Sequence, residues 1–300
     1  MLTPEKQSVR GKIESNASLA EYNSWRVGGP AGLLYIPADI DDISLFMQQL
    51  PEETPLLWLG LGSNILIRDG GVEGAVLVTQ GALSGIMQLD SGYIRSEVGV
   101  SCAQIARYTA RLGLHGLEFM AGIPGTVGGA LFMNAGCYGG ETWPHVYQVE
   151  TIDRQGQKHI RPVSDYQVSY RHVLGPPNEW FTAAHFKLQP GNKTDALNTI
   201  RELLEKRNAA QPTGLPNCGS TFRNPLNHSA GRLIDACGLK GFRIGGAYVS
   251  EKHANFLIND GSATAADIEA LIQSIANTVE QQHGVRLYPE VCIIGKPAAR

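Results

Sequence analysis

The 300-residue sequence has no apolar run near the roughly 18 residues that a membrane-spanning helix needs. It also lacks an excess of charge, because 25 basic and 28 acidic side chains leave a formal net charge of −3. So small a charge argues against the basic surface that binds nucleic acid. The first residues, MLTPEKQSVRGKIESNASLAEY, lack the apolar core of a secretory signal. We therefore expect a cytoplasmic protein with neither a membrane nor nucleic acid as partner.

The usual marks of metal and disulfide chemistry are also missing. The five cysteines are widely spaced and include no C-x-x-C pair, which argues against a disulfide framework and a structural zinc site. No set of His, Cys, Asp and Glu has metal-ligand spacing, so we predict no metal. There is no G-x-S-x-G and no G-x-x-x-x-G-K-[ST], which argues against a serine hydrolase and a P-loop enzyme.

Strand and helix patterns alternate along the chain, so we predict an α+β fold. Amphipathic spacing with capping residues predicts helices, and apolar runs bounded by glycine or proline predict strands. The helices are expected within 39–51, 101–113, 195–211 and 264–284, and the strands within 54–64, 74–80, 91–100, 145–163, 179–188 and 285–295. We expect Leu112 to face the core and Gly113 to end its helix. A domain boundary is expected at about 190–200, where an exposed turn precedes a long helix.

Two stretches are rich in glycine and poor in charge: WLGLGSNILIRDGG at 58–71 and AGIPGTVGGALFMNAGCYGGE at 121–141. Glycine lets consecutive backbone amides turn toward one point and lets a ligand approach the backbone closely, as a pyrophosphate does. The first stretch runs from strand to strand, so it does not fit the Rossmann motif, which opens a helix. Each stretch alone is also explained by tight turns, but the pair favours a dinucleotide such as FAD.

Polar residues gather in other loops. VSYRHV carries Arg171, GSTFRNP carries Ser220, and YPEV carries Glu290 just before an apolar strand. Arg171 alone is explained as a surface arginine, and Glu290 is either a salt-bridge partner or a site residue. His253 and Asn255 either belong to a site or simply hold the strand NFLIN to its neighbour.

A set of motifs occurs in order over residues 23–295: NSWRVGGPA, LGLGSNILIRDGGVEGAVL, GLEFMAGIPGTVGGALFMNAGCYGGE, SYR, CGSTFRNP, AGRLIDACGLKGFRIGGAYVSEKHANFLIN and PEVCIIG. No single motif is specific, but the ordered set closely resembles the MurB family, the UDP-N-acetylenolpyruvoylglucosamine reductases of bacterial cell-wall synthesis. The resemblance covers nearly the whole chain. It is to the short, type II form, because HVLGPPNEWFTAAHF after Arg171 leaves no room for the substrate-capping subdomain inserted in the longer form.

The resemblance implies an FAD-binding fold of the vanillyl-alcohol-oxidase (PCMH) type in two subdomains, 1–78 and 79–192, followed by a C-terminal α+β substrate-binding domain, 193–300. It implies NADPH-dependent reduction of UDP-N-acetylglucosamine enolpyruvate to UDP-N-acetylmuramate through non-covalently bound FAD. The protein would then serve peptidoglycan precursor synthesis, and through it cell shape and cell division. We expect it to act as a monomer.

The match places FAD-binding positions in both glycine stretches. They are Gly60, Leu61, Gly62, Ser63 and Asn64 in the first, and Gly122, Ile123, Pro124, Gly125, Thr126, Val127, Gly128, Gly129, Asn134 and Gly136 in the second. Some members of the wider superfamily attach flavin covalently through histidine, but MurB-like proteins do not. We therefore expect His115 to be an ordinary loop histidine.

Three residues match catalytic positions of the family: Arg171 of SYR, Ser220 of CGS and Glu290 of PEV. In the implied reaction, hydride passes from NADPH to FAD and then to C3 of the enolpyruvyl group, so negative charge develops toward C2. A fixed guanidinium is suited to stabilising that charge, and C2 then needs a proton donor. The match assigns these roles to Arg171 and Ser220, with Glu290 orienting the carboxylate group or sharing its proton.

Tyr170 and Asn224 are further substrate-binding candidates by the same match. The family often has a basic residue just before Gln-Pro at the end of the 195–211 helix. Here that residue is Ala210, so we expect Arg207 to contact the substrate phosphate instead.

Two other functions stay open on the residues alone. One is a different flavin oxidoreductase on the same fold, such as a sugar oxidase, against which GSTFRNP and PEV speak. Its distinguishing test is oxygen against an enolpyruvyl ether as oxidant. The other is a nucleotide-binding protein without activity, which purified protein lacking flavin would favour.

Overall fold

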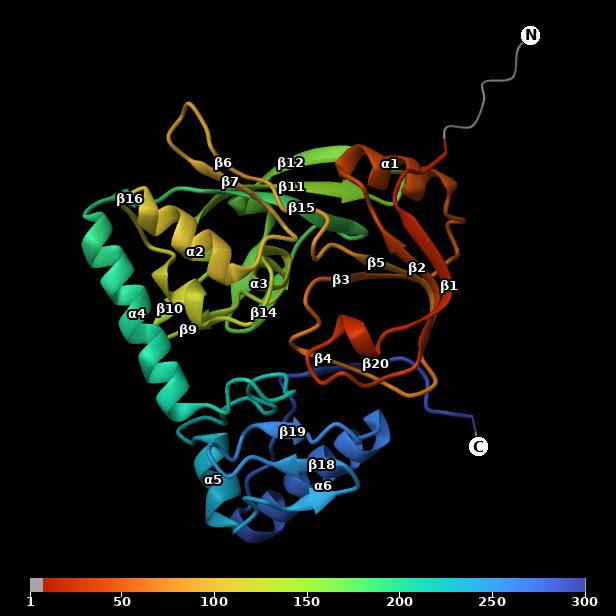
Figure 1. The fold of residues 1–300 in the computed structure, drawn as a ribbon, viewed down its shortest axis with the longest axis vertical. Helices are drawn as coiled ribbons and strands as arrows, with labels where there is room; N and C mark the ends of the chain where they lie inside the picture. Colours follow the sequence, from red (N-terminus) through yellow and green to blue (C-terminus); the bar gives the residue numbers. More distant parts are fainter. Residues whose placement is uncertain (1–7, 300) are drawn as a thin grey trace. The chain divides into compact units, whose positions relative to one another are not determined.

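Residues 8–299 are described by a computed structural model, drawn in Figure 1. Helices and strands are mixed along the chain, which confirms the predicted α+β class. The described residues form two compact units: unit 1 holds 8–14, 34–60 and 74–204, and unit 2 holds 15–33, 61–73 and 205–299. The chain thus passes repeatedly between the units, which are not contiguous stretches. The division into domains 1–78, 79–192 and 193–300 stays a prediction.

The predicted helices are all present. The α-helices of the described residues are α1 (Ile40–Gln49), α2 (Cys102–Arg111), α3 (Val127–Phe132), α4 (Lys193–Ala210), α5 (Ala230–Ala236) and α6 (Ala265–His283). Short 3-10 helices are η1 (Ala20–Tyr22), η2 (Glu118–Gly122), η3 (Trp143–His145) and η4 (Val163–Asp165). Most helix ends agree with the capping residues in the sequence, as α2 and α6 show below.

The strands also fall where the apolar runs predicted them, with several short additions. They are β1 (Lys12–Ser18), β2 (Pro30–Ile36), β3 (Leu56–Leu59), β4 (Ile65–Ile67), β5 (Val72–Val78), β6 (Ile86–Gln88), β7 (Ile94–Glu97), β8 (Leu114–His115), β9 (Gly136–Cys137), β10 (Gly140–Glu141), β11 (Val146–Asp153), β12 (Lys158–Pro162), β13 (Gln167–Ser169), β14 (His172–Leu174), β15 (Glu179–Phe186), β16 (Gln189–Pro190), β17 (Arg243–Ile244), β18 (Ala247–Val249), β19 (Leu257–Asn259) and β20 (Cys292–Ile294).

Unit 1 is built around an antiparallel sheet in the order β12-β11-β15-β7-β6. β11 and β12 form a hairpin that turns at Gln155–Gly156, where Gly156 has a left-handed φ of 77°. The short helix α3 packs on β15 and β7 (Figure 1). The sheet therefore carries the second glycine stretch, from which α3 is formed.

A second sheet has the strand order β1-β2-β5-β3, in which β3 and β5 run parallel. The side chain of Asp39 caps the first turn of α1 by accepting a hydrogen bond from Asp42 N. The buried Asp42 carboxylate in turn accepts hydrogen bonds from the backbone N–H groups of Arg10 and Gly11. β3 ends at Leu59, so the first glycine stretch leaves the edge of this sheet.

α2 begins at a capping box. Ser101 Oγ accepts a hydrogen bond from Gln104 N at 3.2 Å, and Gln104 Oε1 accepts one from Ser101 N at 3.0 Å. The prediction for Leu112 is wrong, because its side chain is 45% exposed. Leu112 lies after the last helical residue and Gly113 follows with a φ of 70°, so helical spacing no longer governs where Leu112 points.

Unit 2 contains the antiparallel sheet β17-β18-β19 and the parallel pair β4–β20. Helix α6 packs on β17 and β18, and α5 packs on α6. Thr264 and Asp267 form a capping box at the start of α6, and Gly284 ends the helix with a φ of 66°. The indole N–H of Trp25 donates to the Leu257 carbonyl at 2.8 Å within the core of this unit. The apolar face of α6 is buried in the same core: Ile268, Leu271, Ile272, Ile275 and Val279.

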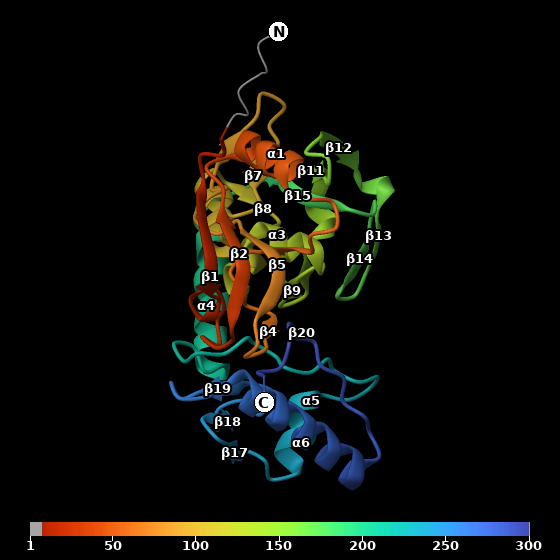
Figure 2. The same ribbon diagram turned by 90° about the vertical axis from the view of Figure 1, so that its right-hand side faces the viewer.

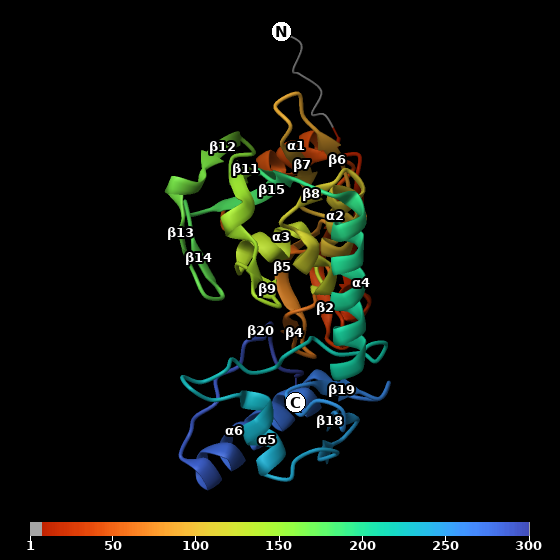
Figure 3. The same cartoon turned by 90° about the vertical axis from the view of Figure 1, so that its left-hand side faces the viewer.

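The SYR motif lies in a hairpin of unit 1. Tyr170 and Arg171 are the two-residue turn between β13 and β14, and Figures 2 and 3 show this hairpin at the side of the unit. Only residues 175–178 connect β14 to β15. No subdomain is inserted between these strands, as the short form of the family requires.

A single carboxylate, that of Glu150, makes contacts with side chains on two neighbouring strands of the unit 1 sheet. The Glu150 carboxylate on β11 accepts hydrogen bonds from Arg95 of β7 and contacts His185 Nε2 of β15, all at 2.7 Å. Burial acts to raise the pKa of Glu150, but the bonds with His185 and Arg95 outweigh it and lower the pKa to about 2. The ionised carboxylate is therefore part of what stabilises the sheet.

We predict that Glu150→Gln lowers the free energy of unfolding by about 1–3 kcal/mol at pH 7, because Arg95 loses its charged partner. The carboxylate stabilises the fold above its ordinary pKa of 4.5, and this contribution is lost as the pH falls through about 2. Urea unfolding at several pH values should show the difference between wild type and variant shrinking from about pH 4.5 downward.

Glu73→Gln is the matched control, because Glu73 and its partner Lys296 are 69% and 61% exposed. Its effect should stay within about 0.5 kcal/mol. A difference between wild type and Glu150→Gln that stays constant from about pH 7 to pH 3 would contradict the role assigned to the Glu150 charge.

Candidate active site

The first glycine stretch forms the loop between β3 and β4, and the boundary between the units falls inside it. Gly60, in unit 1, is so close to Thr126 that a Cβ on Gly60 would lie 2.4 Å from Thr126 Oγ1. Gly62, in unit 2, has a φ of 65°, and its Cβ would lie 2.3 Å from the Tyr22 carbonyl oxygen. Both positions therefore require glycine.

The second stretch differs from the expectation in one respect. The amides of Val127 and Gly128 donate to the carbonyl oxygens of Val100 and Val98, at 2.8 and 2.9 Å. These two N–H groups are therefore used within the protein and do not turn toward a ligand. The prediction that consecutive amides of this stretch face a phosphate is wrong for them, although their contact with FAD stays a prediction.

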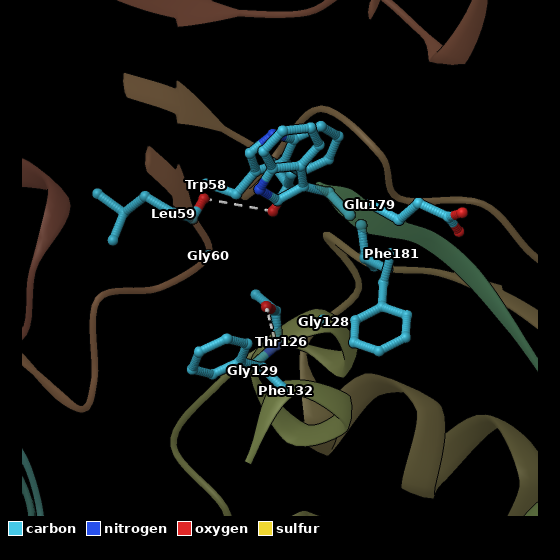
Figure 4. Close-up of a pocket in the computed structure, with 12 residues that line it drawn as sticks. Trp58, Leu59, Gly60, Thr126, Gly128, Gly129, Phe132, Glu179 and Phe181 are labelled. Atoms are coloured by element: carbon cyan, nitrogen blue, oxygen red, sulfur yellow. Dashed lines mark hydrogen bonds between the residues drawn. The ribbon is translucent and has the colours of Figure 1, made fainter. Parts of the chain in front are cut away.

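Unit 1 contains a cavity of about 240 Å³ beside these glycines (Figure 4). It is lined by Gly60, Thr126 and Gly129, and a Cβ on Gly129 would meet no atom closer than 3.9 Å. Aromatic side chains line the rest: Trp58, Phe132, Trp180 and Phe181. Open backbone on one side and apolar ring faces on the other suit a planar organic group, so this cavity fits a part of FAD.

Glu179 is a charged side chain in the lining of this cavity. Arg161 Nε donates to Glu179 Oε2 at 3.0 Å and Thr151 Oγ1 donates to the same oxygen at 2.6 Å. Burial acts to raise the pKa of Glu179, but the bonds with Arg161 and Thr151 outweigh it and keep the pKa below its usual range. Because Arg161 balances the carboxylate charge, the cavity does not repel an anionic cofactor.

Asn134, near the end of the second stretch, is buried and has a left-handed φ of 45°. Its Oδ1 accepts a hydrogen bond from Trp143 N at 3.1 Å, and its Nδ2 donates to Glu141 Oε2 at 3.0 Å. The side chain thus holds this stretch in shape. A contact of Asn134 with FAD stays a prediction.

The Arg171 side chain is hydrogen-bonded to the second glycine stretch. Its NH2 donates to the Gly136 carbonyl at 2.9 Å and its NH1 to the Asn134 carbonyl at 3.4 Å, and the guanidinium lies 5.0 Å from the Tyr170 ring centre. The backbone of Arg171 has a φ of 56°, a conformation that is rare outside glycine and asparagine. The structure therefore brings Arg171 together with Asn134 and Gly136, which the sequence had assigned to the cofactor.

Ser220 and Glu290 come together in unit 2. Glu290 N donates to the Thr221 carbonyl at 2.8 Å, directly after Ser220 in the chain. The side chain of Asn64 donates to the Glu290 carbonyl at 3.1 Å. The two predicted catalytic residues and the end of the first glycine stretch therefore share one backbone network. Arg171 belongs to unit 1.

Asn255 holds the Ser220 loop, and sequence reasoning had left its role open. Its buried side chain accepts a hydrogen bond from Phe222 N at 3.0 Å and donates to Phe222 O at 2.9 Å. Its carbonyl accepts a further bond from Thr221 N at 2.8 Å. The structural alternative for Asn255 is thus confirmed, but it fixes the loop beside Ser220 rather than only the strand that follows.

The remaining candidates have local partners. Asn224 Oδ1 accepts a hydrogen bond from Ala230 N at 3.0 Å, at the start of α5. Arg207 Nε donates to Gln211 Oε1 at 3.2 Å, beyond the end of α4. Tyr170 is 54% exposed at the tip of its hairpin. Their contacts with substrate stay predictions.

The aromatic side of the cavity is the part of the site that sequence reasoning missed. Trp58 directly precedes the first glycine loop, which was its one available signal. Trp180 and Phe181 belong to β15, and only the pairing of distant strands brings them to the cavity. Among residues 8–299, no helix is long and apolar enough to cross a membrane, and no three His, Cys, Asp or Glu side chains are placed to hold a metal ion.

The chain is similar to known proteins over almost its entire length. Residues 31–160 match the family model of an FAD binding domain, and residues 211–294 match that of the C-terminal domain of UDP-N-acetylenolpyruvoylglucosamine reductase. A protein of that name from Legionella pneumophila (strain Corby) is 56% identical over 95% of this chain and 93% of its own. Another, from Nitrosococcus oceani, is 55% identical over 97% of this chain and 98% of its own.

The same similarity is found in the fold of a solved structure. The crystal structure of UDP-N-acetylenolpyruvylglucosamine reductase (MurB) from Thermus caldophilus has a TM-score of 0.81 at 32% identity, covering 95% of this chain and 98% of that one. The FAD-binding match contains both glycine stretches and the cavity residue Trp58. The chain therefore belongs to the UDP-N-acetylenolpyruvoylglucosamine reductase (MurB) family and is an FAD-containing oxidoreductase.

Proposed function

We propose that the protein reduces UDP-N-acetylglucosamine enolpyruvate to UDP-N-acetylmuramate in peptidoglycan precursor synthesis, with NADPH as hydride donor. The observation that carries this function is 56% identity over 95% of the chain to a named reductase. Bound FAD supplies the hydride-transfer chemistry. The protein works in the cytoplasm as a monomer and contributes to cell shape and cell division.

Both glycine stretches and the cavity beside them hold FAD. Gly60 and Gly129 leave room for close approach to the backbone, and Thr126 offers a hydroxyl between them. Apolar ring faces exclude water from the far side of the cavity. The absence of uncompensated charge in the lining is consistent with a cofactor held by backbone and apolar contacts.

Arg171 stabilises the negative charge that develops on the enolpyruvyl group. Two of its N–H groups bind the carbonyl oxygens of Asn134 and Gly136, which fixes the plane of the guanidinium. A guanidinium presents its N–H donors as a planar fork, the geometry that binds a carboxylate. A charge fixed before the reaction costs little reorganisation during it.

Ser220 donates the proton to C2, and Glu290 orients the substrate carboxylate group or shares its proton. No hydrogen bond of Ser220 Oγ is formed within residues 8–299, and the residue is half-buried. The backbone pair between Thr221 and Glu290 sets the separation of the two side chains. A substitution that breaks this backbone hydrogen bond would therefore slow proton transfer, even though both side chains remain.

The proposed function predicts a yellow protein that NADPH bleaches in the absence of oxygen. Colour should return on addition of the enolpyruvyl substrate, because the substrate accepts the hydride. A sugar oxidase would instead be bleached by a sugar and recoloured by oxygen alone. Acid precipitation should leave all flavin in the supernatant, and flavin in the pellet would show a covalent link.

Arg171→Lys should lower kcat by on the order of 10²-fold or more, because an ammonium group cannot reproduce the planar fork. FAD content and the KM for NADPH should stay near wild type. Arg154→Lys is the matched control, since Arg154 also binds backbone carbonyls, those of Pro51 and Thr54, but takes no part in the proposed site. If the two variants have the same kcat, Arg171 is only a surface arginine.

Ser220→Ala separates the two half-reactions. Bleaching by NADPH needs no proton at carbon, so its rate should stay close to wild type in anaerobic stopped-flow. Recolouring by the enolpyruvyl substrate should slow by roughly 10²–10⁴-fold, the range for loss of a positioned general acid. Ser220→Cys keeps a proton-bearing group in place and should retain more activity than Ser220→Ala. Equal slowing of both halves would mean that Ser220 only shapes its loop.

A further inference from the structure

The aromatic side of the unit 1 cavity has no role in the assignments above. Trp58 of β3 and Trp180 of β15 form a parallel pair, with ring centres 5.8 Å apart and an angle of 6° between the planes. Both line the cavity and both are half-buried. Figure 4 shows Trp58 across the cavity from Phe132, whose side chain is 67% exposed. Large apolar faces thus border a space that no protein group fills.

The polar atom of Trp58 is not the part of the ring that a ligand would meet. Its indole N–H is buried and forms no hydrogen bond within residues 8–299. A buried tryptophan N–H usually has an acceptor, because leaving it unpaired costs free energy. This N–H lies in the ring plane and is closed off from solvent, so a ligand in the cavity meets the ring face, on which an aromatic ring can stack.

FAD has two ring systems, one at each end of its diphosphate, and only the isoalloxazine reacts. Arg171, the proposed charge-stabilising residue, binds Gly136 and does not line the cavity. The cavity instead adjoins Gly128 and Gly129, earlier in the same stretch. The reacting ring must lie within reach of the substrate that Arg171 contacts. The cavity is therefore suited to the ring that does not react, which is adenine.

We propose that Trp58 and Trp180 bind the adenine ring of FAD and that this contact gives the protein its preference for FAD over FMN. The inference rests on FAD binding and assigns a role to two residues of this chain. FMN ends at its phosphate, so it gains nothing from the tryptophan pair. Stacking of a base on an aromatic side chain changes affinity by about 5- to 100-fold on substitution, which is enough to discriminate between the two cofactors.

The test measures dissociation constants for FAD, FMN and ADP with the full chain after removal of its flavin. Flavin and tryptophan fluorescence report binding without any turnover. Trp58→Leu should raise the dissociation constant for FAD by about 5- to 100-fold and weaken the quenching of tryptophan fluorescence by ADP. The dissociation constant for FMN should change by less than about 2-fold. Trp58→Phe keeps an aromatic ring with a smaller face, so its FAD affinity should fall between wild type and Trp58→Leu.

Trp180→Leu provides a second variant, in case loss of Trp58 prevents folding of β3, and should give the same pattern. Tyr147→Leu is the matched control. It removes an aromatic ring that is 48% exposed and paired with Tyr93, away from the cavity lining. Its affinities for FAD, FMN and ADP should equal those of the wild type.

Unchanged FAD affinity in both Trp58→Leu and Trp180→Leu would overturn the proposal. Equal losses for FAD and FMN would also overturn it, because the cavity would then hold the isoalloxazine or the shared phosphate. Either result leaves the proposed function standing as long as NADPH still bleaches the bound flavin. A wild-type protein with no affinity for FAD would instead contradict the function itself.

Discussion

The close contact of Gly60 with the Thr126 hydroxyl is the constraint on which the cofactor site depends. A side chain at residue 60 would place a Cβ 2.4 Å from Thr126 Oγ1, so β3 could not end where it does. Through this contact the edge of one sheet meets the start of α3, which packs on the other. The cavity exists because these two elements approach without a side chain between them. Glycine here serves close approach, which explains why amides such as those of Val127 and Gly128 can be used elsewhere.

Main-chain contacts help to position the groups assigned to the chemistry. Arg171 is held by the carbonyl oxygens of Asn134 and Gly136, and Glu290 is held by the carbonyl oxygen of Thr221. A backbone carbonyl cannot titrate and has few conformations to lose. Such partners therefore fix a position without adding a second group that titrates. Glu150 is positioned differently, because its carboxylate binds the side chains of Arg95 and His185 and stabilises a sheet.

Local signals in the sequence predicted local structure well. The ends of α6 are correct because Thr264 caps it and Gly284 ends it through interactions within a few residues. The prediction that Leu112 faces the core was wrong because helical spacing was applied one residue past the end of α2. The catalytic candidates came from resemblance and were found beside backbone partners that no pattern marks. The tryptophan pair could not be predicted, since strand pairing alone decides that Trp180 reaches Trp58.

The backbone conformation of Arg171 bears on the role proposed for this residue. A non-glycine residue with a φ of 56° costs on the order of 1–2 kcal/mol relative to glycine, because its Cβ crowds the following carbonyl. A surface arginine without a role would gain stability by being replaced with glycine in this turn. The strain persists where the guanidinium also binds Gly136 within the FAD-binding match. The turn places the side chain at the cofactor stretch, which agrees with the role proposed for Arg171.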